Sequence, residues 1–394
     1  MSTASTQTGS IVHGGLTITH IEAFPVSYPL PEGDSVTLGI GRTVKRDAVV
    51  VKVTTADGIV GYGESHHGRS VIAIATLVNT TLRHLVCGMD ASDVVGVWAR
   101  VYKMQLGSHG MGAATSMAMS GIDMALWDIR GKATGWPLWK LLGGRRKGIR
   151  AYAGGVALGY QAPDALVEEA RPLVEQGYQA LKVRVGDTVQ RDIERVCAVR
   201  KAFGEQLTIL TDANCGYTVQ NALDVMPALD ANRVQWLEEP FPAHDYRSYQ
   251  EARGFGRVRF AAGENHYTRF EFNHLLSEGA VSYWQPDLSK CGGITEGLRI
   301  AAMASAHKIT INPHSAMSGI NMAATIHFLS AIENHGYFEA DVAKTNFLRD
   351  RLVEMPYQVD ANGEVWALDR PGLGVEVDED FIKAYPATDG PAYI

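Results

Sequence analysis

The chain has 394 residues, of which 46% are hydrophobic and 20% are charged, and its 36 basic and 43 acidic side chains give a net charge of −7. This length predicts one large barrel-type domain, a barrel with a second domain, or two ordinary domains. The composition excludes a disordered chain and a collagen-like repeat, and the acidic balance without a basic tract excludes nucleic acid as an expected partner.

The N-terminal residues 1–15 are polar and lack the basic flank and apolar stretch of a signal peptide, so we interpret them as a disordered leader. No uninterrupted apolar run approaches the roughly 20 residues that cross a bilayer, so we expect no membrane partner. Four scattered cysteines without a CxxC pair favour a reducing compartment, and we expect a cytoplasmic protein. We also expect a homo-oligomer.

Residues 16–143 have the pattern of an α+β domain. Runs rich in β-branched residues at 16–26 and 47–55 predict strands, and a turn signal at 54–58 joins the second run to a third strand in a hairpin. The helical patterns that follow cover residues 70–86 and 112–134. The second of these helices carries many small residues, which indicates close packing.

A Gly-rich, charged segment at 143–147 marks a change of pattern. From residue 144 to 354, short apolar β-type runs alternate with helical stretches, which is typical of a parallel sheet built from βα units. The residues that end eight such runs follow one another at intervals of 23 to 30 residues, the spacing of a (β/α)8 barrel. These residues are Tyr152, Lys182, Asp212, Glu238, Glu264, Asp287, His314 and Glu339.

Residues 355–394 contain turn signals at 362–363 and 371–372 but no further βα unit, so we expect this segment to return to the N-terminal domain. The sequence therefore predicts an α/β fold, a TIM-type barrel at 144–354 beside the α+β domain. Barrel enzymes carry their chemistry at the C-terminal ends of the strands, where seven of the eight residues are ionisable.

Three of the strand-end residues form a carboxylate set. Asp212, Glu238 and Glu264 end successive strands and would repel one another unless a cation lay among them. An all-oxygen set without Cys or His favours Mg²⁺. In the alternative interpretation each carboxylate only caps the following helix, which the position of Asp212 would suit. Three carboxylates in register favour the metal site.

Two cations lie on the second barrel strand. Lys182 and Arg184 alternate with apolar neighbours, so both side chains are expected to point into the barrel. Their anionic partner would be a substrate carboxylate bound to the metal. Each cation should lower the proton affinity of the other, which suits a lysine in acid-base chemistry. The alternative for Arg184 is a salt bridge to the acidic ring.

A general base is predicted at the sixth and seventh strand ends. Asp287 and His314 would be neighbours in a barrel, and a carboxylate beside an imidazole orients the ring, fixes its tautomer and raises its basicity. Glu339 ends the eighth strand, with Asp341 as the alternative. A carboxyl group kept protonated there would donate a hydrogen bond to a developing oxyanion.

These residues at these intervals resemble the enolase superfamily, and specifically its mandelate racemase subgroup, from residue 16 to the end of the chain. The resemblance implies an N-terminal capping domain that the C-terminal segment completes, Mg²⁺ held by the three carboxylates, and removal of a proton α to a carboxylate to give an enediolate. The motifs that carry the resemblance are the Lys-x-basic pair at Lys182, Thr-Asp-Ala-Asn at 211–214, Trp-Leu-Glu-Glu-Pro at 236–240, Gly-Glu-Asn at 263–265, Gln-Pro-Asp-Leu-Ser-Lys-Cys-Gly-Gly at 285–293 and Asn-Pro-His at 312–314.

Two positions distinguish this chain within the superfamily. Asp287 stands where the muconate-cycloisomerase-like subgroup has a lysine, and Lys290, three residues further on, cannot take that place. Arg184 stands where the racemase has a second lysine, and an arginine that stays protonated is a poor general base. The resemblance therefore implies chemistry on one face of the substrate rather than two-base racemisation.

We expect the enzyme to dehydrate a sugar acid, an aldonate or an aldarate, to a 2-keto-3-deoxy acid. His314 would remove the C2 proton and then protonate the leaving C3 hydroxyl, while Lys182, Glu339 and the metal stabilise the enediolate and Arg184 holds substrate oxygens. The alternatives are a racemase or epimerase acting at the α-carbon and, from another class, a catalytically silent binding protein. The Gly-rich segment 30–42 suits a mobile lid. Further expected contacts to the small carboxylate substrate are His66, His67 and Asn214.

Overall fold

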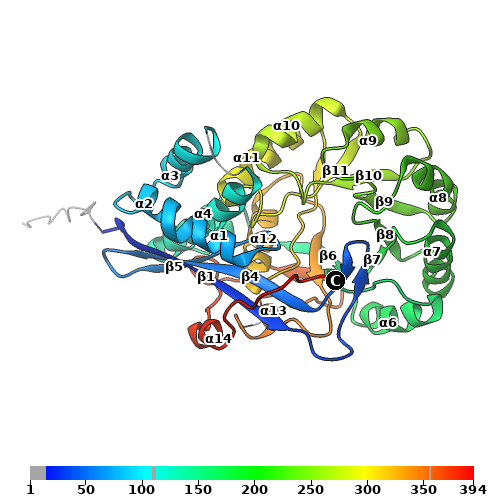
Figure 1. Cartoon of the computed structure of the whole chain (residues 1–394), viewed down its shortest axis with the longest axis horizontal. Coiled ribbons are helices and arrows are strands. Elements are labelled where there is room, and N and C mark those ends of the chain that lie inside the picture. Colours follow the sequence, from blue (N-terminus) through cyan, green and yellow to red (C-terminus); the bar gives the residue numbers. More distant parts are fainter. Residues whose placement is uncertain (1–14, 109–111, 355) are drawn as a thin grey trace, which may run out of the picture.

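The computed structural model describes residues 15–108, 112–354 and 356–394. It shows two bodies side by side, an N-terminal sheet covered by helices and a larger ring of strands and helices (Figure 1). The predicted leader, 1–15, lies outside the described residues except for Gly15. In the described part of the chain, no helix has the length and apolar character needed to span a membrane.

The N-terminal body contains a three-stranded antiparallel sheet in the order β1-β4-β5. The predicted turn joins two of these strands, because Gly58, with a φ of +80°, donates its N–H to the carbonyl of Thr55 at 3.0 Å. The prediction of an α+β domain is confirmed. Its elements are β1 (Ile18–Pro29), β2 (Thr37–Leu38), β3 (Gly41–Arg42), β4 (Lys45–Thr55), β5 (Val60–Ser65), α1 (Val71–Leu77), η1 (Val78–Leu82), α2 (Arg83–Val86), α3 (Val94–Val101), η2 (Tyr102–Leu106), α4 (Ala113–Thr134) and α5 (Leu138–Leu141), where η marks a π-helical segment.

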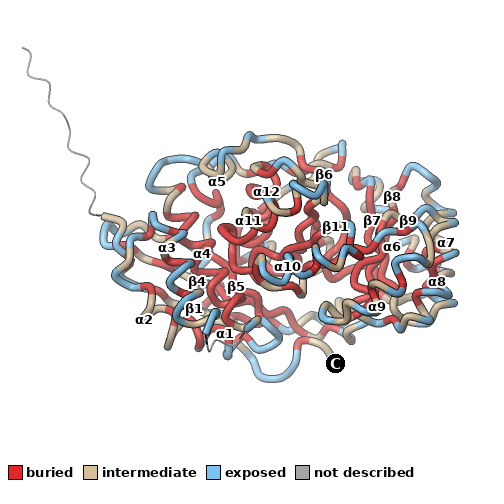
Figure 2. The backbone as a smooth tube through the Cα atoms, turned by 90° about the horizontal axis from the view of Figure 1, so that it is seen from above, coloured by how far each residue is buried: buried red, intermediate tan, exposed pale blue. Residues whose placement is uncertain are grey.

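Helix α4 is the predicted helix of small residues, and it packs directly on β5. Gly63 of the strand and Gly121 of the helix approach so closely that a Cβ atom built on Gly63 would lie 2.1 Å from the carbonyl oxygen of Gly121. Figure 2 shows α4, α11 (Gly293–Ala306) and α12 (Gly319–Ala331) as a largely buried layer. The small residues are therefore required by the contact between sheet and helix.

Helix α3 lies where no element was predicted. Its sequence is rich in valine, and β-branched residues disfavour an isolated helix. Val94, Val97 and Trp98 lie at helical spacing and are buried, and the Asp93 side chain caps the helix by accepting from the N–H of Gly96 at 2.8 Å. Packing rather than local propensity therefore decides this helix.

Among the described residues, eight parallel strands form the larger body in the order β12-β11-β10-β9-β8-β7-β6-β13. An isolated bridge links Ile311, in β12, to His335, three residues before β13. A helix follows each of the first seven strands, whereas the eighth is followed only by the four-residue α13 (Phe347–Asp350). The barrel prediction is confirmed, with an abbreviated last unit. The remaining elements are β6 (Gly148–Gly154), α6 (Pro163–Glu175), β7 (Ala180–Arg184), α7 (Val189–Phe203), β8 (Thr208–Asp212), α8 (Val219–Ala231), β9 (Val234–Glu238), α9 (Tyr246–Ala252), β10 (Arg259–Ala262), α10 (Thr268–Glu278), β11 (Val281–Trp284), β12 (Thr310–Ile311) and β13 (Phe338–Asp341).

The C-terminal segment contacts both bodies. Its strand β14 (Glu364–Trp366) pairs antiparallel with β6 of the barrel, a contact that was not predicted. Helix α14 (Glu379–Ala384) then leads back to the N-terminal body, where the backbone of Ile394 pairs with that of Arg42 through hydrogen bonds of 2.8 and 2.9 Å. The segment thus completes the capping domain, as expected.

Hydrogen bonds from the capping domain hold the loops at the C-terminal ends of the barrel strands. The hydroxyl of Ser116, in α4, donates to the carbonyl of Lys290 at 2.7 Å. The indole N–H of Trp98, in α3, donates to the carbonyl of Gly292 at 3.0 Å. These contacts position the capping domain against the loop that follows β11.

Candidate active site

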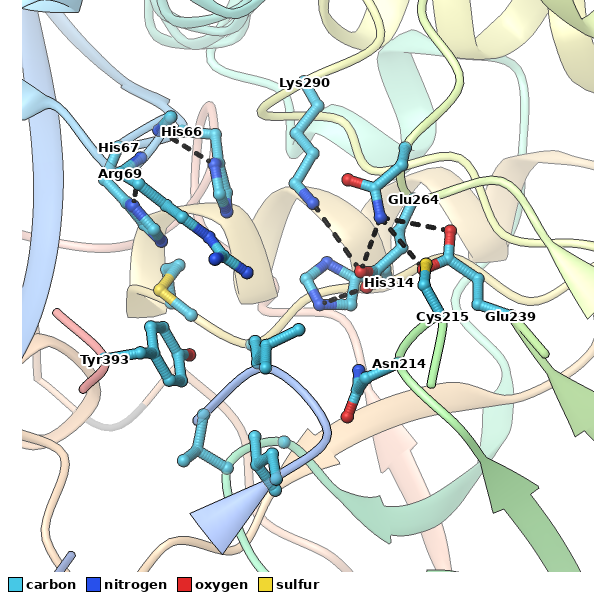
Figure 3. Close-up of a pocket in the computed structure, with 18 of the residues that line it drawn as sticks. His66, His67, Arg69, Asn214, Cys215, Glu239, Glu264, Lys290, His314 and Tyr393 are labelled. Atoms are coloured by element: carbon cyan, nitrogen blue, oxygen red, sulfur yellow. Dashed lines mark hydrogen bonds and ion pairs between the residues drawn. The ribbon is translucent and has the colours of Figure 1, made fainter. Parts of the chain in front are cut away.

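A cavity of about 270 Å³ lies at the C-terminal ends of the barrel strands, where the capping domain faces them (Figure 3). Its volume suits a ligand smaller than a typical drug molecule. Its polar lining includes Arg184, Asn214, Glu264, Lys290 and His314 from the barrel, His66, His67 and Arg69 from the capping domain, and Tyr393 from the C-terminal segment.

Lys182 lies among three carboxylates of the barrel. Its Nζ is 2.9 Å from Glu238, 2.9 Å from Glu339 and 3.3 Å from Asp212. Burial alone would lower the pKa of this lysine, but the carboxylates outweigh burial and raise the pKa well above its usual value. The proton affinity of Lys182 is therefore raised and not lowered as expected, because several carboxylates outweigh one cation.

Glu238 and Asp212 lie opposite each other on the neighbouring strands β8 and β9. The second oxygen of Glu238 accepts from Nε2 of Gln285 at 2.7 Å and from the indole N–H of Trp236 at 3.3 Å. Burial and the charge of Asp212 raise the pKa of Glu238 to about 8. The predicted repulsion between these carboxylates is thus present in the structure.

Asp212 does not cap the following helix. Its Oδ1 accepts from the N–H of Asn214 at 2.9 Å, within the turn that ends β8. Helix α8 is capped instead by Thr218, whose hydroxyl accepts from the N–H of Asn221 at 3.1 Å. The helix-cap alternative is therefore wrong for Asp212.

Arg184 forms the salt bridge considered as its alternative. Its guanidinium contacts Asp212 and the carbonyl of Gly155, and its Nη1 is 3.2 Å from Oδ1 of Asn214. Burial opposes the charged form, but Asp212 and the other carboxylates nearby together raise the pKa above its usual value. Arg184 therefore brings a permanent positive charge to the wall of the cavity.

His314 and Asp287 form the predicted pair. Nδ1 of His314 is 2.6 Å from Oδ2 of Asp287. The other oxygen of Asp287 accepts from the N–H of Ser289 at 2.7 Å and from Nδ2 of Asn321 at 3.1 Å, so the carboxylate is held on both sides. Nε2 of His314 lies 2.9 Å from Glu264. Burial would lower the pKa of His314, but Glu264, Glu339 and Asp287 together raise it well above its usual value.

Glu339 is ionised, which corrects the expectation of a protonated hydrogen-bond donor. Burial would raise the pKa of its carboxyl group, but the charges of Lys182, His314 and Arg184 together outweigh burial and lower the pKa to about 2. Its Oε1 also accepts from the N–H of Gly155 at 3.0 Å. The alternative residue, Asp341, pairs instead with Arg46 at 3.2 Å.

The structure brings further side chains to this site that the strand-end spacing did not select. Glu239 accepts from Nδ2 of Asn265 at 2.9 and 3.1 Å, and burial and the charge of Glu264 raise its pKa well above the usual value. Lys290 is buried, with its Nζ 4.0 Å from Glu264. Both residues stand inside the motifs quoted above, but the barrel period selects only one residue in each motif.

The donor chemistry fits a magnesium ion. Asp212, Glu238 and Glu264 present only oxygen atoms at the ends of three adjacent strands, and Mg²⁺ prefers such ligands. Within the described part of the chain, no three His, Cys, Asp or Glu side chains already surround a common metal position. Lys182 contacts Asp212 and Glu238, and His314 contacts Glu264.

Two protein families match the chain. Residues 21–143 match the family described as mandelate racemase / muconate lactonizing enzyme, N-terminal domain. Residues 165–381 match the family described as enolase C-terminal domain-like. Together the two matches cover both bodies of the structure.

Named relatives and solved structures agree with these matches. The arabinonate dehydratase of Saccharolobus solfataricus is 33% identical over 86% of this chain and 90% of its own length. The D-galactarolactone cycloisomerase of Agrobacterium fabrum is 32% identical over 88% of this chain and 93% of its own length. An enolase superfamily member from Polaromonas sp. JS666 has a TM-score of 0.94 and 56% identity over 96% of this chain and 100% of its own. A racemase from Streptomyces coelicolor with bound magnesium has a TM-score of 0.84 and 29% identity over 94% of this chain and 100% of its own.

Proposed function

Because this chain belongs to the mandelate racemase and muconate lactonizing enzyme family of the enolase superfamily, and is therefore an enzyme, we propose that it dehydrates a sugar acid to a 2-keto-3-deoxy acid. The observation that carries the proposal is the contact of 2.6 Å between His314 and Asp287 at the wall of the cavity. The relative named arabinonate dehydratase supports this reaction class.

His314 is the general base of the proposed reaction. Asp287 accepts from Nδ1, so Nε2, once released from Glu264, is the atom that takes the proton from C2 of the substrate. The electron pair of the broken C–H bond forms an enediolate, and the positive charges of Lys182 and Arg184 stabilise it. The imidazolium then protonates the C3 hydroxyl, which leaves as water, and the resulting enol tautomerises to the 2-keto acid.

Asp212, Glu238 and Glu264 would hold one Mg²⁺ ion in this proposal, after Lys182 and His314 release the oxygens that they contact. The racemase of Streptomyces coelicolor with bound magnesium supports this assignment. When bound, Mg²⁺ supplies Lewis-acid stabilisation of the negative charge that develops on the substrate carboxylate.

Chemistry on one face is favoured over racemisation. A racemase of this type needs a second base opposite His314, and the two cations of β7 do not supply one. Lys182 lies 2.9 Å from both Glu238 and Glu339, and Arg184, which stays protonated, is paired with Asp212. Recovered substrate from a reaction in D2O should therefore carry deuterium at C2 without inversion.

The test is a screen of configurationally defined aldonates and aldarates for formation of a 2-keto acid. Turnover should appear with Mg²⁺ and disappear with EDTA. Formation of an epimer without a 2-keto acid would overturn dehydration in favour of an epimerase. No turnover and no solvent deuterium exchange with any acid would favour the catalytically silent binding protein.

We propose in addition that the protein is cytoplasmic and forms a homo-oligomer. The described cysteines Cys87, Cys197, Cys215 and Cys291 are all unpaired thiols, which supports a reducing compartment. We also propose 16–143, 144–354 and 355–394 as the capping domain, the barrel and the returning segment. Sedimentation equilibrium would measure the oligomeric state.

A further inference from the structure

The loop that follows β5 places three nitrogen-bearing side chains on the wall of the cavity that faces the barrel. His66, His67 and Arg69 all line the cavity, and Figure 3 shows them together on one side of it, apart from Glu264 and Glu239. We call these three residues the cap triad. The catalytic proposal above does not use them.

Hydrogen bonds from the backbone fix the tautomers of both histidines. The N–H of Gly68 donates to Nδ1 of His66 at 3.1 Å, and the N–H of Arg69 donates to Nδ1 of His67 at 2.8 Å. A nitrogen that accepts a hydrogen bond carries no proton, so each neutral ring carries its hydrogen on Nε2. Burial lowers the pKa of both rings, to about 3 for His67, which keeps them neutral.

The two Nε2–H groups have no hydrogen-bond acceptor among the described residues. The rings are nonetheless almost fully buried, since His66 is 7% and His67 is 4% exposed. Both N–H groups reach the cavity that these rings line, where a ligand acceptor can pair with them.

Arg69 adds a positive charge beside these donors. Its guanidinium lies over the ring of Tyr393 at 5.3 Å, and no acidic side chain of the described residues pairs with it. Lys290, the other cation near this wall, differs because it faces Glu264 at 4.0 Å. The backbone of Arg69 is held in a left-handed conformation, with φ of +58°, by its own N–H bond to His67.

The cap triad therefore presents hydrogen-bond donors and one net positive charge, whereas the opposite wall presents carboxylates. A group that fits the triad must be an acceptor and an anion. A carboxylate satisfies both conditions, because its two oxygens accept several hydrogen bonds and pair with a guanidinium.

We propose that the cap triad binds a second carboxylate at the far end of the substrate, so that the enzyme acts on dicarboxylic sugar acids in preference to monocarboxylic ones. This inference rests on the proposed dehydration and specifies its substrate class. The imidazole N–H groups orient the distal carboxylate, and Arg69 neutralises its charge.

The test compares kcat/KM for matched pairs of an aldarate and the aldonate of the same configuration, in the galacto, gluco and manno series, with 6-phosphogluconate as a third arm. The wild type should prefer the aldarate of the pair that it accepts. Arg69→Met should lower kcat/KM for the aldarate by roughly 10- to 100-fold, mainly through an increase in KM. The same substitution should change kcat/KM for the aldonate by less than about threefold. Arg69→Lys should retain part of the preference.

Arg42→Met is the matched control, because Arg42 belongs to the same N-terminal body, in β3, but does not line the cavity. It should leave the preference unchanged. Equal losses for aldarate and aldonate in Arg69→Met, or a wild-type preference for the aldonate, would overturn the distal carboxylate site while dehydration stands. A preference for the phosphorylated acid over every aldarate would also overturn it, in favour of a phosphate ester.

If the wild type turns over no acid, dehydration itself is overturned, and the distal site is judged by binding. The aldarates should then raise the Tm of the magnesium-loaded wild type more than the aldonates do, and Arg69→Met should remove the difference. Equal shifts from both acid classes would overturn the site.

Discussion

Glu64→Gln tests how the capping domain is coupled to the loop that carries the general base. Glu64, in β5, is 0% exposed, and its Oε2 accepts from the N–H of Ser318 at 3.2 Å and contacts the Ser318 hydroxyl. Its Oε1 has no hydrogen-bond partner among the described residues. Burial raises the pKa of Glu64 from 4.5 to about 8, and the charge of Asp287 adds to the increase. The folded protein therefore holds this carboxyl group protonated at neutral pH.

The size of the effect follows from this pKa difference. Between pH 4.5 and about 8 the unfolded chain releases the proton of Glu64 and the folded chain keeps it, so the free energy of unfolding decreases as the pH rises. One pH unit in this window corresponds to about 1.4 kcal/mol. From about pH 5.5 to about pH 7.5, the contribution of Glu64 should therefore fall by about 3 kcal/mol.

Glutamine keeps the acceptor for Ser318 and does not titrate. Relative to the wild type, Glu64→Gln should become more stable by about 3 kcal/mol over those two pH units. Urea titrations at both pH values, followed by tryptophan fluorescence and far-UV circular dichroism, measure this difference. Glu251→Gln, at an exposed position of α9, is the control and should show no such trend. A difference between Glu64→Gln and wild type that stays constant with pH would refute a protonated Glu64.

Three further predictions concern the base, the metal and the fold. His314→Asn should lower kcat by about 10²- to 10⁴-fold and abolish solvent deuterium exchange with little change in Tm, and turnover near the wild-type rate would exclude His314 as the base. Mg²⁺ added to protein that a chelator has freed of metal should raise the Tm, with a stabilisation of about 3 kcal/mol at an Mg²⁺ concentration 100 times the Kd. An equal rise in Tm for Glu264→Gln would contradict the assignment of Glu264 as a ligand. Gly63→Ala should destabilise the protein by at least about 2 kcal/mol, because the new Cβ would lie 2.1 Å from the carbonyl oxygen of Gly121. Gly254→Ala, where a Cβ would meet nothing within 4 Å, should be neutral. Equal unfolding free energies for the two variants would contradict the packing argument.

The sequence alone determined the barrel and the residues at its mouth. Parallel strands joined by helices repeat at a regular spacing, and their C-terminal ends meet at one edge, so the period that located Asp212, Glu238 and Glu264 also placed them together. The pairing of His314 with Asp287 followed from the same rule, because the sixth and seventh strands are neighbours.

Only the tertiary structure decided the charges within this site and the wall opposite it. The proton affinities predicted for Lys182 and Glu339 were wrong, because they depend on the number of opposite charges within a few ångströms of each group. The spacing of the strands in the sequence does not predict how many opposite charges surround a group. The contact of Arg69 with Tyr393 joins residues more than three hundred positions apart, and local sequence patterns carry no signal for such a contact. Periodicity therefore locates residues along each strand, whereas burial and Coulomb interactions arise only when distant segments pack together.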